Sequence, residues 1–360
     1  MTRLAEIRRR MAESDVDGLL ISDEVSASYL SGFDFSDGYL AILADAAYLV
    51  TDFRYTEAAE ASVAGDFIVV EAKGGTLSEA LDRLVRGGAK NVAFEENAVT
   101  VVRLDKMQSL ADGKLTFFGK ASAWLSEMRC VKSEDELLAI EEAQRITDAA
   151  FAYILGEITP NMTEREVALA LEFFMRKQGA EDIAFDVIAV SGSASSLPHG
   201  VPRDVRLERG FLTMDFGARV RGYCADMTRT VVLGKADAEM KKLYDTVLLA
   251  QSEALAYLAA GGRSCHEADA VARAIIDGAG YKGAFGHSLG HGVGRYVHES
   301  PRLSPAVSTN ERIYVGNVVT VEPGIYLKGK YGCRIEDMVV ITENGIKNFT
   351  KSKKDLIELF

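Results

Sequence analysis

The second two-thirds of the chain repeats one order of secondary structure twice, and this repeat most constrains the fold. A Ser/Thr-x-x-Glu pattern satisfies free amide groups at a helix N-terminus, and it occurs at Ser133 with Glu136, Thr163 with Glu166 and Ser264 with Glu267. A fourth helix is predicted at residues 238–262. The order is two helices and strands at 133–234, then two helices and strands at 237–342. Two long units, rather than many short repeats, indicate one domain with pseudo-twofold symmetry.

Residues 1 to about 120 alternate short apolar strands with helices. Strand-like runs rich in apolar residues occur at residues 18–22, 38–45, 46–52, 66–72 and 91–96. Residues 76–88 predict a helix that ends at glycine. At 360 residues the chain exceeds the usual length of one domain. We therefore predict an α+β protein, with a small α/β domain at residues 1–122 and a second domain at residues 123–360.

Charge and composition exclude several classes of protein. The net charge is -12, which opposes nucleic-acid binding because such binding depends on clustered Lys and Arg. The sequence contains no run of about 18 uncharged apolar residues and no signal-peptide pattern, so we expect neither a membrane span nor secretion. The four cysteines are far apart and form no Cys-x-x-Cys pair, which indicates reduced thiols in a cytoplasmic protein.

Two predicted hairpins each carry a pair of acidic residues. Asp215 and Asp226 are eleven positions apart, and a hairpin with its turn around residues 219–222 can place them directly opposite each other on one face. Glu322 and Glu336 are fourteen positions apart, which fits a loop of three or five residues around Gly329. We therefore expect four carboxylates on two apolar hairpins.

Carboxylates held this close need a partner for their charge. Like charges raise each other's pKa, and burial adds to the cost, so a bound cation would stabilise the group. In the alternative each acid faces an arginine, because Arg229 lies three positions after Asp226 and Arg334 lies two before Glu336. Four acids on apolar strands favour the cation. We interpret Cys224 as a small buried side chain rather than as a thiolate ligand that would favour zinc.

The segment GHSLGHGVGRYVHES, residues 286–300, contains three of the chain's five histidines and four glycines. Glycine permits a close backbone approach or a positive φ, and histidine can bind metal or exchange protons near neutral pH. The segment is either a site around a metal or substrate, or a tight crossing of strands whose histidines are only hydrogen-bonded. Its place between the two acidic hairpins favours the site.

Four carboxylates and one imidazole would form an oxygen-rich ligand set. Such a set can hold two divalent cations roughly 3.5–4 Å apart. Oxygen ligands with one nitrogen suit manganese, which we expect, or cobalt, and zinc and iron are further options.

These motifs resemble a known family. The segments MDFGARVRGYCADMTRT, GHSLGHGVGRYVHESP, TVEPGIYL and CRIEDMVVIT, with SSLPHG upstream, are similar to those of the pita-bread dinuclear metallopeptidases, in the branch of aminopeptidase P and prolidase. The resemblance spans nearly the whole chain and implies a creatinase-like N-terminal domain followed by a pita-bread catalytic domain. It implies two divalent metal ions per chain, with Asp226 and Glu336 as bridging ligands. The full ligand set that it implies is Asp215, Asp226, His291, Glu322 and Glu336.

The resemblance also implies roles around the metals. Glu322 would act as general base and then as general acid. The substrate site would be shaped by His199, His287 and His298. Of these, His298 or His199 would donate a hydrogen bond to the developing oxyanion. Arg334 and Tyr326 would orient the metal ligands.

The activity that the resemblance implies is the release of the first residue from peptides whose second residue is proline, by an Xaa-Pro aminopeptidase or an Xaa-Pro dipeptidase. Short proline-containing peptides would be the substrates, and the enzyme would be a homodimer. Two alternatives stay open, a metalloaminopeptidase without proline specificity and a metal-binding scaffold of the same fold that holds a peptide or protein without catalysis. His199 and His298 favour the enzyme, because a scaffold would not need them beside the metals.

Overall fold

The computed structural model describes residues 2–63 and 65–360. The chain forms two compact units, Met1–Met128 and Arg129–Phe360, which we call the first and second units. Helix α6 (Ala121–Cys130) continues without a break past residue 122, where the first predicted domain ends. The domain boundary after residue 122 therefore stays a prediction.

The first unit is built on one six-stranded sheet with the strand order β4-β3-β2-β1-β5-β6. Its strands are β1 (Gly18–Ile21), β2 (Gly38–Leu43), β3 (Ala47–Thr51), β4 (Ile68–Glu71), β5 (Asn91–Phe94) and β6 (Thr116–Gly119). Its helices are α1 (Arg3–Glu13), α2 (Glu24–Ser31), α3 (Phe53–Ser62), α4 (Thr76–Arg86) and α5 (Val101–Ala111). The five predicted strands and the helix that ends at Gly87 are confirmed. The short edge strand β6 was not predicted from the sequence.

Apolar side chains cover both faces of this sheet. Leu19 and Ile21 of β1 belong to one buried cluster, whereas Leu20 between them belongs to another. Successive side chains of a strand point to opposite faces, so a strand buried on both faces reads as an unbroken apolar run. This is why the run GLLI predicted a strand without any alternation of polar residues.

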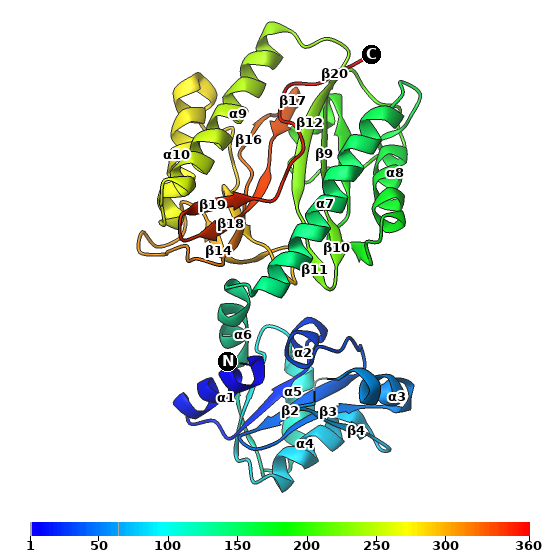
Figure 1. Ribbon diagram of the computed structural model, residues 1–360, viewed down its shortest axis with the longest axis vertical. Coiled ribbons are helices and arrows are strands. Elements are labelled where there is room, and N and C mark those ends of the chain that lie inside the picture. The colour runs from blue at the N-terminus through cyan, green and yellow to red at the C-terminus, as the bar shows by residue number, and fades with distance from the viewer. Residues whose placement is uncertain (1, 64) are drawn as a thin grey trace. The chain divides into compact units, whose positions relative to one another are not determined.

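The second unit places two pairs of helices around central strands. The helices are α7 (Glu134–Glu157), α8 (Glu164–Lys177), α9 (Ala238–Ala259) and α10 (Cys265–Ile276). Figure 1 shows α7 and α8 on one side of the strands and α9 and α10 on the other. The predicted repeat of two helices followed by strands is therefore confirmed, and each half supplies one layer of helices.

The helix starts follow the capping signals, with one correction. Ser133 and Thr163 each form a complete capping box with the glutamate three positions later. Ser264 accepts a hydrogen bond from the Glu267 amide, but the Glu267 carboxylate accepts instead from the Tyr257 hydroxyl at 2.7 Å. The third predicted capping box is therefore only half formed, because a tertiary partner takes its glutamate.

The strands of the second unit form four sheets, with the orders β11-β10-β7, β20-β12-β9-β8, β14-β13-β15-β18-β19 and β16-β17. The first half contributes β7 (Asp182–Ile183), β8 (Ile188–Ser191), β9 (Gly210–Phe216), β10 (Ala218–Val220), β11 (Tyr223–Cys224) and β12 (Met227–Leu233). The second half contributes β13 (Gly290–Gly292), β14 (Glu299–Leu303), β15 (Val318–Val321), β16 (Gly324–Leu327), β17 (Tyr331–Arg334), β18 (Asp337–Thr342) and β19 (Gly345–Asn348), with β20 (Glu358–Leu359) after it.

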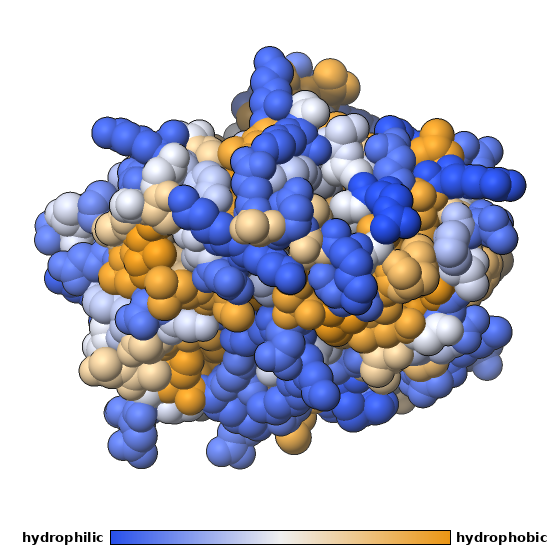
Figure 2. Space-filling view, turned by 90° about the horizontal axis from the view of Figure 1, so that it is seen from above, coloured by the Kyte–Doolittle hydropathy of each residue, from blue (hydrophilic) through white to orange (hydrophobic). Residues whose placement is uncertain are grey.

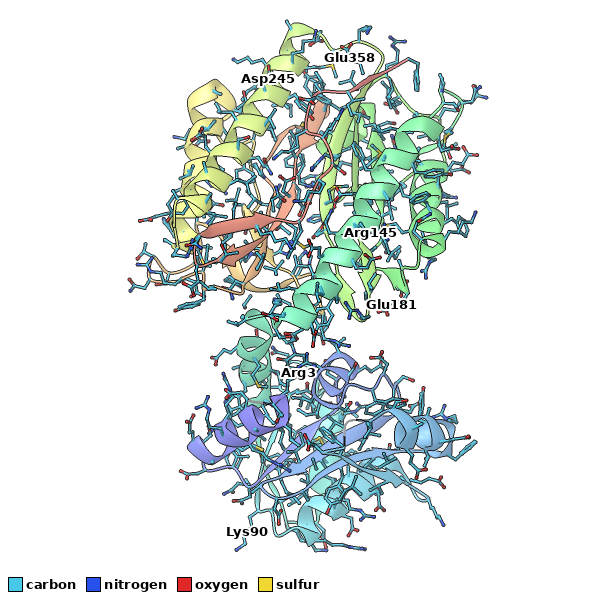
Figure 3. The ribbon with its side chains drawn as sticks, viewed as in Figure 1. Arg3, Lys90, Arg145, Glu181, Asp245 and Glu358 are labelled. Atoms are coloured by element: carbon cyan, nitrogen blue, oxygen red, sulfur yellow. The ribbon has the colours of Figure 1, made fainter. Side chains whose placement is uncertain are left out.

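The register of the first acidic hairpin differs from the prediction. Asp215 pairs with Thr228 and not with Asp226, which lies two positions earlier. The cause is the turn, because Arg221 and Gly222 both adopt positive φ and form a two-residue loop between β10 and β11. The Gly222 amide donates to the carboxylate of Glu181 at 2.6 Å, and Figure 3 labels Glu181 at this end of the unit. The two aspartates are therefore diagonal rather than opposite.

The register of the second acidic hairpin agrees with the prediction. Leu327 pairs with Tyr331, which leaves a three-residue loop centred on Gly329, whose φ is +72°. On the other side of the two glutamates, Val321 pairs with Asp337. Both pairings place Glu322 opposite Glu336, at the gap between two short ladders.

The surface mixes polar and apolar residues. Figure 2 shows hydrophobic residues interspersed among hydrophilic ones on the face seen from above, as is usual for folded proteins. None of the helices in the described part of the chain combines the length and the apolar character needed to cross a membrane.

Candidate metal centre

A cavity of about 750 Å³ opens beside the central strands of the second unit. It brings together residues that are more than 130 positions apart in the sequence. Eight of the predicted site residues line it, namely His199, Asp215, Asp226, His287, His291, His298, Glu322 and Arg334. The remaining two, Tyr326 and Glu336, are outside this lining. Tyr326 accepts a hydrogen bond from Arg334, and Glu336 is linked to Arg334 through the Thr228 hydroxyl.

Three of the side chains form a compact group of potential metal ligands. One ligand atom from each of Asp226, His291 and Glu336 lies within 4.8 Å of the others. The His291 Nε2 atom is 3.6 Å from Oδ2 of Asp226 and 3.3 Å from Oε1 of Glu322. Three of the four predicted carboxylate ligands thus lie close to the His291 imidazole.

The backbone around His291 sets its tautomer. Its Nδ1 atom lies 3.0 Å from the Gly292 carbonyl oxygen, so Nδ1 carries a hydrogen and Nε2 is the ring nitrogen that faces the carboxylates. A Cβ at Gly292 would lie 2.2 Å from the Ser300 carbonyl oxygen, and one at Gly290 would lie 2.1 Å from the Thr320 carbonyl oxygen. These two glycines therefore permit the tight crossing of strands that aims the His291 ring.

Asp215 is held by an arginine from the other half of the unit. Arg334 donates from Nη2 to Oδ2 of Asp215 at 2.6 Å. Arg229 instead pairs with Asp337 at 2.8 Å. The alternative in which Arg229 and Arg334 balance Asp226 and Glu336 is therefore wrong, because strand register directs both guanidinium groups to other carboxylates.

No basic side chain at the described positions forms an ion pair with Glu336 in this group, and Asp226 faces only His291. Burial raises the pKa of Asp226 and of Glu336 well above ordinary values, and repulsion from neighbouring carboxylates raises both further. Burial also raises the pKa of Asp215, although Arg334 opposes that shift. Among the described residues, Oδ1 of Asp215 and Oε1 of Glu336 are buried oxygen atoms without a hydrogen-bond partner. Divalent cations fit this donor set, because they would coordinate these oxygens and remove the repulsion.

The pKa shifts of Glu322 and His291 favour the charged form of each residue. Burial would raise the pKa of Glu322, but the hydrogen bond and the charge of His291 outweigh burial and lower this pKa to about 2. Burial favours the neutral ring of His291, but Glu322 outweighs burial and raises that pKa. Glu322 is therefore ionised over the whole physiological range of pH.

The other predicted histidines differ in their hydrogen-bond partners and in their exposure to the cavity. The His298 ring lies edge-on to His291, with ring centroids 4.3 Å apart, and burial lowers its pKa. Both ring nitrogens of His287 have partners, Tyr326 OH at 2.9 Å and the Ser288 carbonyl oxygen at 2.8 Å. His199 is exposed in the cavity wall. His298 and His199 can therefore face a ligand, whereas His287 braces Tyr326.

Cys224 does not join the acidic group. It is buried in an apolar cluster with Ala225 and Val293, and burial raises the pKa of its thiol to about 12. A protonated thiol packed among apolar side chains agrees with the interpretation of Cys224 as a small buried residue.

Three residues at this site were missed in the sequence. Thr228 donates to Oε2 of Glu336 at 2.7 Å and accepts from Arg334 Nε at 2.9 Å, and Thr320 donates to Oε1 of Glu322 at 3.3 Å. Each threonine lies two positions from an acid along a strand, and that spacing was a usable signal. Arg302 lines the cavity, and no local pattern distinguished it from a surface arginine.

Comparison with known proteins agrees with this geometry. The model of metallopeptidase family M24 matches residues 139–343, and the model of the creatinase/prolidase N-terminal domain matches residues 3–131. The chain is 39% identical over 360 residues to the Xaa-Pro dipeptidase of Pyrococcus horikoshii, covering 99% of this chain and 98% of that protein.

Solved structures are similar over nearly the whole chain. An Xaa-Pro dipeptidase from Bacillus anthracis superposes with a TM-score of 0.92 at 37% identity, covering 99% of each chain. An X-Pro aminopeptidase from Thermotoga maritima superposes with a TM-score of 0.89 at 38% identity, covering 97% of this chain and 100% of that one.

Proposed function

Since the chain belongs to metallopeptidase family M24, we propose that it is an Xaa-Pro exopeptidase, which releases the first residue from short peptides whose second residue is proline. The observation that carries the proposal is the group of Asp226, His291 and Glu336 beside an open cavity. Relatives named Xaa-Pro dipeptidase and X-Pro aminopeptidase support the choice of substrate.

The unbalanced carboxylates support a centre of two divalent metal ions. Manganese suits the oxygen-rich donor set best, and cobalt, zinc and iron are the alternatives. When bound, such ions lower the pKa of water to near neutrality and polarise the scissile carbonyl. The residues proposed to hold them are Asp215, Asp226, His291, Glu322 and Glu336.

The chain's own residues would handle protons and charge around the peptide bond. Glu322 is ionised, so its carboxylate can accept a proton from the attacking water and return it to the leaving nitrogen. Burial keeps His298 mainly neutral, and a neutral imidazole still has one N–H to donate to the oxyanion. His199, which also lines the cavity, is the second candidate donor.

One arginine in the cavity wall favours dipeptides over longer peptides. The lining contains two arginines, and Arg334 is engaged with Asp215. The other, Arg302, is held through Nε by the Ser288 hydroxyl at 3.0 Å, so its terminal nitrogens can bind a carboxylate. The C-terminal carboxylate of an Xaa-Pro dipeptide would lie one residue from the scissile bond, and an arginine would bind it bidentately.

The proline preference is tested with matched dipeptides on manganese-loaded protein. Ala-Pro should be cleaved faster than Ala-Ala, because an ordinary amide would place an unsatisfied N–H in a site fitted to proline, at a cost of about 1–3 kcal/mol, or roughly 5- to 150-fold in kcat/KM. Equal rates on the two would leave a metalloaminopeptidase without proline specificity. If neither peptide is hydrolysed, the non-catalytic scaffold is the better description.

The dipeptide preference is tested by removing one charge from each partner. Ala-Pro and its C-terminal amide differ only in the carboxylate, so wild-type protein should prefer the acid, and Arg302→Gln should reduce that preference. Removing a charge-assisted hydrogen bond costs about 1.5–3 kcal/mol, so KM for Ala-Pro should rise about 10-fold or more. An unchanged ratio of acid to amide in Arg302→Gln would exclude Arg302 as the carboxylate site.

A further inference from the structure

Two helix carboxylates outside the metal centre, one in each half of the second unit, are completely buried. Glu164 lies on α8 and Asp269 on α10, and both are 0% exposed. Each pairs with an arginine and also accepts a backbone amide from a segment beside a cavity histidine. Neither belongs to the cavity lining nor to the group of metal ligands.

Glu164 closes the base of the loop that carries His199. Its Oε1 atom accepts from the Ser191 amide at 2.8 Å and from the Ser191 hydroxyl at 2.9 Å. Its Oε2 atom accepts from the Arg203 amide at 3.0 Å and from Arg203 Nε at 2.9 Å. Ser191 and Arg203 flank residues 192–202, so one carboxylate holds both ends of the loop.

Asp269 holds the segment that carries His287. Its Oδ1 atom accepts from the Leu289 amide at 2.9 Å, and its carboxylate takes both Nε and Nη2 of Arg273, at 2.7 and 2.9 Å. Arg273 then donates to the carbonyl oxygens of Phe285 at 2.6 Å and of His287 at 2.9 Å. The pair therefore fixes this segment at three alternate backbone positions.

The same segment is hydrogen-bonded to Glu322, between β15 and β16, and to Tyr326 in β16. The Glu322 amide donates to the Leu289 carbonyl oxygen at 2.8 Å, and the Tyr326 amide donates to the Ala284 carbonyl oxygen at 3.0 Å. Leu289 thus links Asp269 through its N–H to Glu322 through its C=O. A displacement of the segment would move both the His287 ring and the Glu322 backbone.

Stability alone does not account for these pairs. Removing charges from water costs several kcal/mol, and apolar side chains of similar volume often pack in their place without loss. The hydrogen bonds are instead directed at the backbone of the two histidine segments, where a displacement of about 1 Å can cost about 100-fold in rate.

We propose that Glu164 and Asp269, with Arg203 and Arg273, are positioning residues that set the geometry of the cavity histidines, Glu164 for His199 and Asp269 for His287. The effect on turnover rests on the proposed peptidase function, whereas the effect on the histidine rings does not. The two are therefore tested separately.

The first experiment observes the rings directly. The chain has five histidines, so each ring resonance in a proton–carbon correlation spectrum can be assigned by single replacements. Asp269→Asn should shift the His287 resonance, and Glu164→Gln should shift that of His199. The matched control is Glu172→Gln, which removes another helical pair on α8, 3.0 Å from Arg176 and partly exposed. Uniform shifts of all five resonances, or none at the named ring, would overturn the proposal.

The second experiment measures turnover of Ala-Pro together with thermal unfolding. Asp269→Asn and Arg273→Met should lower kcat about 10- to 100-fold, as loss of an orienting partner typically does, with a smaller change in KM. Asp269→Asn keeps an acceptor for the Leu289 amide, so it should retain more activity than Asp269→Ala. A lower Tm with unchanged kcat would show a purely structural role. If wild-type protein cleaves no Ala-Pro, the proposed function fails and the ring spectra still decide the positioning role.

Discussion

Arg334 and Asp215 are 119 positions apart and belong to different halves of the second unit, yet Nη2 of Arg334 donates to Oδ2 of Asp215 at 2.6 Å. The same guanidinium donates to the Tyr326 hydroxyl at 2.7 Å and to the Thr228 hydroxyl at 2.9 Å. Only a planar group with several donors can make these bonds at once. Arg334 therefore orients a proposed ligand from each half of the repeat, Asp215 directly and Glu336 through Thr228.

Replacing Arg334 with lysine should weaken metal binding. Lysine keeps the charge but cannot donate in three fixed directions, so Asp215 and Thr228 would lose their orientation. We expect manganese affinity to fall about 10- to 100-fold, measured by titration calorimetry on protein freed of metal. Arg302→Lys, in the same cavity but without a bond to Asp215, should keep the wild-type affinity. Equal affinities of all three proteins would remove Arg334 from this role.

The stabilisation that manganese confers should grow with pH. The raised pKa values of Asp226 and Glu336 mean that the metal-free fold keeps protons that the unfolded chain has already lost. The stability that Asp226 and Glu336 contribute to the metal-free fold is therefore fully present below their ordinary pKa values. It is lost as pH rises through the raised values. Glu322, with its pKa at about 2, does not titrate in this window.

The measurement is calorimetry of loaded and chelated protein. The difference in Tm between the two should be larger at about pH 7.5 than at about pH 5.5, because protons replace the cations at lower pH. In Glu336→Gln the chelated protein should lose less stability over the same interval. A Tm difference that does not change with pH would contradict the assignment of these carboxylates.

The two histidines at the metal centre should separate in their effects. His291→Ala removes the Nε2 atom that lies among the carboxylates, so metal content and turnover should fall together. His298→Ala removes only the ring beside it, so metal content should persist while turnover is lost. Elemental analysis with a peptide assay distinguishes the two, and the reverse pattern would show that the ligand assignment is wrong.

Thr228→Val should destabilise the fold and the metal centre together. The Thr228 hydroxyl is fully buried and links Glu336 to Arg334, so valine leaves two polar groups without their partner. We expect a loss of about 1–3 kcal/mol in the free energy of unfolding, measured by urea titration, and weaker manganese binding. Thr246→Val, which removes a hydroxyl bonded only to the Lys242 carbonyl oxygen, should lower the unfolding free energy less and leave metal affinity unchanged.

The first unit should contain its own pH-dependent element. Burial raises the pKa of Glu95 to about 7, although the amides of Ser22 and Asp23 donate to its carboxylate and oppose the shift. The folded chain holds this proton to a higher pH than the unfolded chain does. Stability from Glu95 is thus fully present below its ordinary pKa and is lost as pH rises through about 7.

Glu95→Gln mimics the protonated carboxyl and should remove this loss. A shift of this size corresponds to roughly 3 kcal/mol, so the decline in unfolding free energy between about pH 5 and pH 8 should be smaller in the variant. Glu96→Gln, at the next position, is the control and should follow the wild-type curve. Parallel curves for wild type and Glu95→Gln would show that Glu95 does not titrate as described.

Local chemistry determined much of this structure. The complete capping boxes at Ser133 and Thr163 act over four residues, so the helix starts could be predicted from the sequence. Apolar runs predicted five strands of the first unit, and the spacing of Glu322 and Glu336 predicted the three-residue loop at Gly329. In each of these cases the partners are neighbours in the chain, and the sequence contains both of them.

Tertiary packing decided the rest. The sequence did not show that Asp215 pairs with Thr228, because one backbone turn at Arg221 and Gly222 changes the register by two positions. Glu267, expected in a capping box, bonds to Tyr257 instead. The sequence by itself placed two acids on each of two hairpins and three histidines in the segment between them. Which arginine balances which acid depends on contacts across more than 100 positions, as between Arg334 and Asp215 or Arg229 and Asp337, and those form only when the two halves of the second unit pack together.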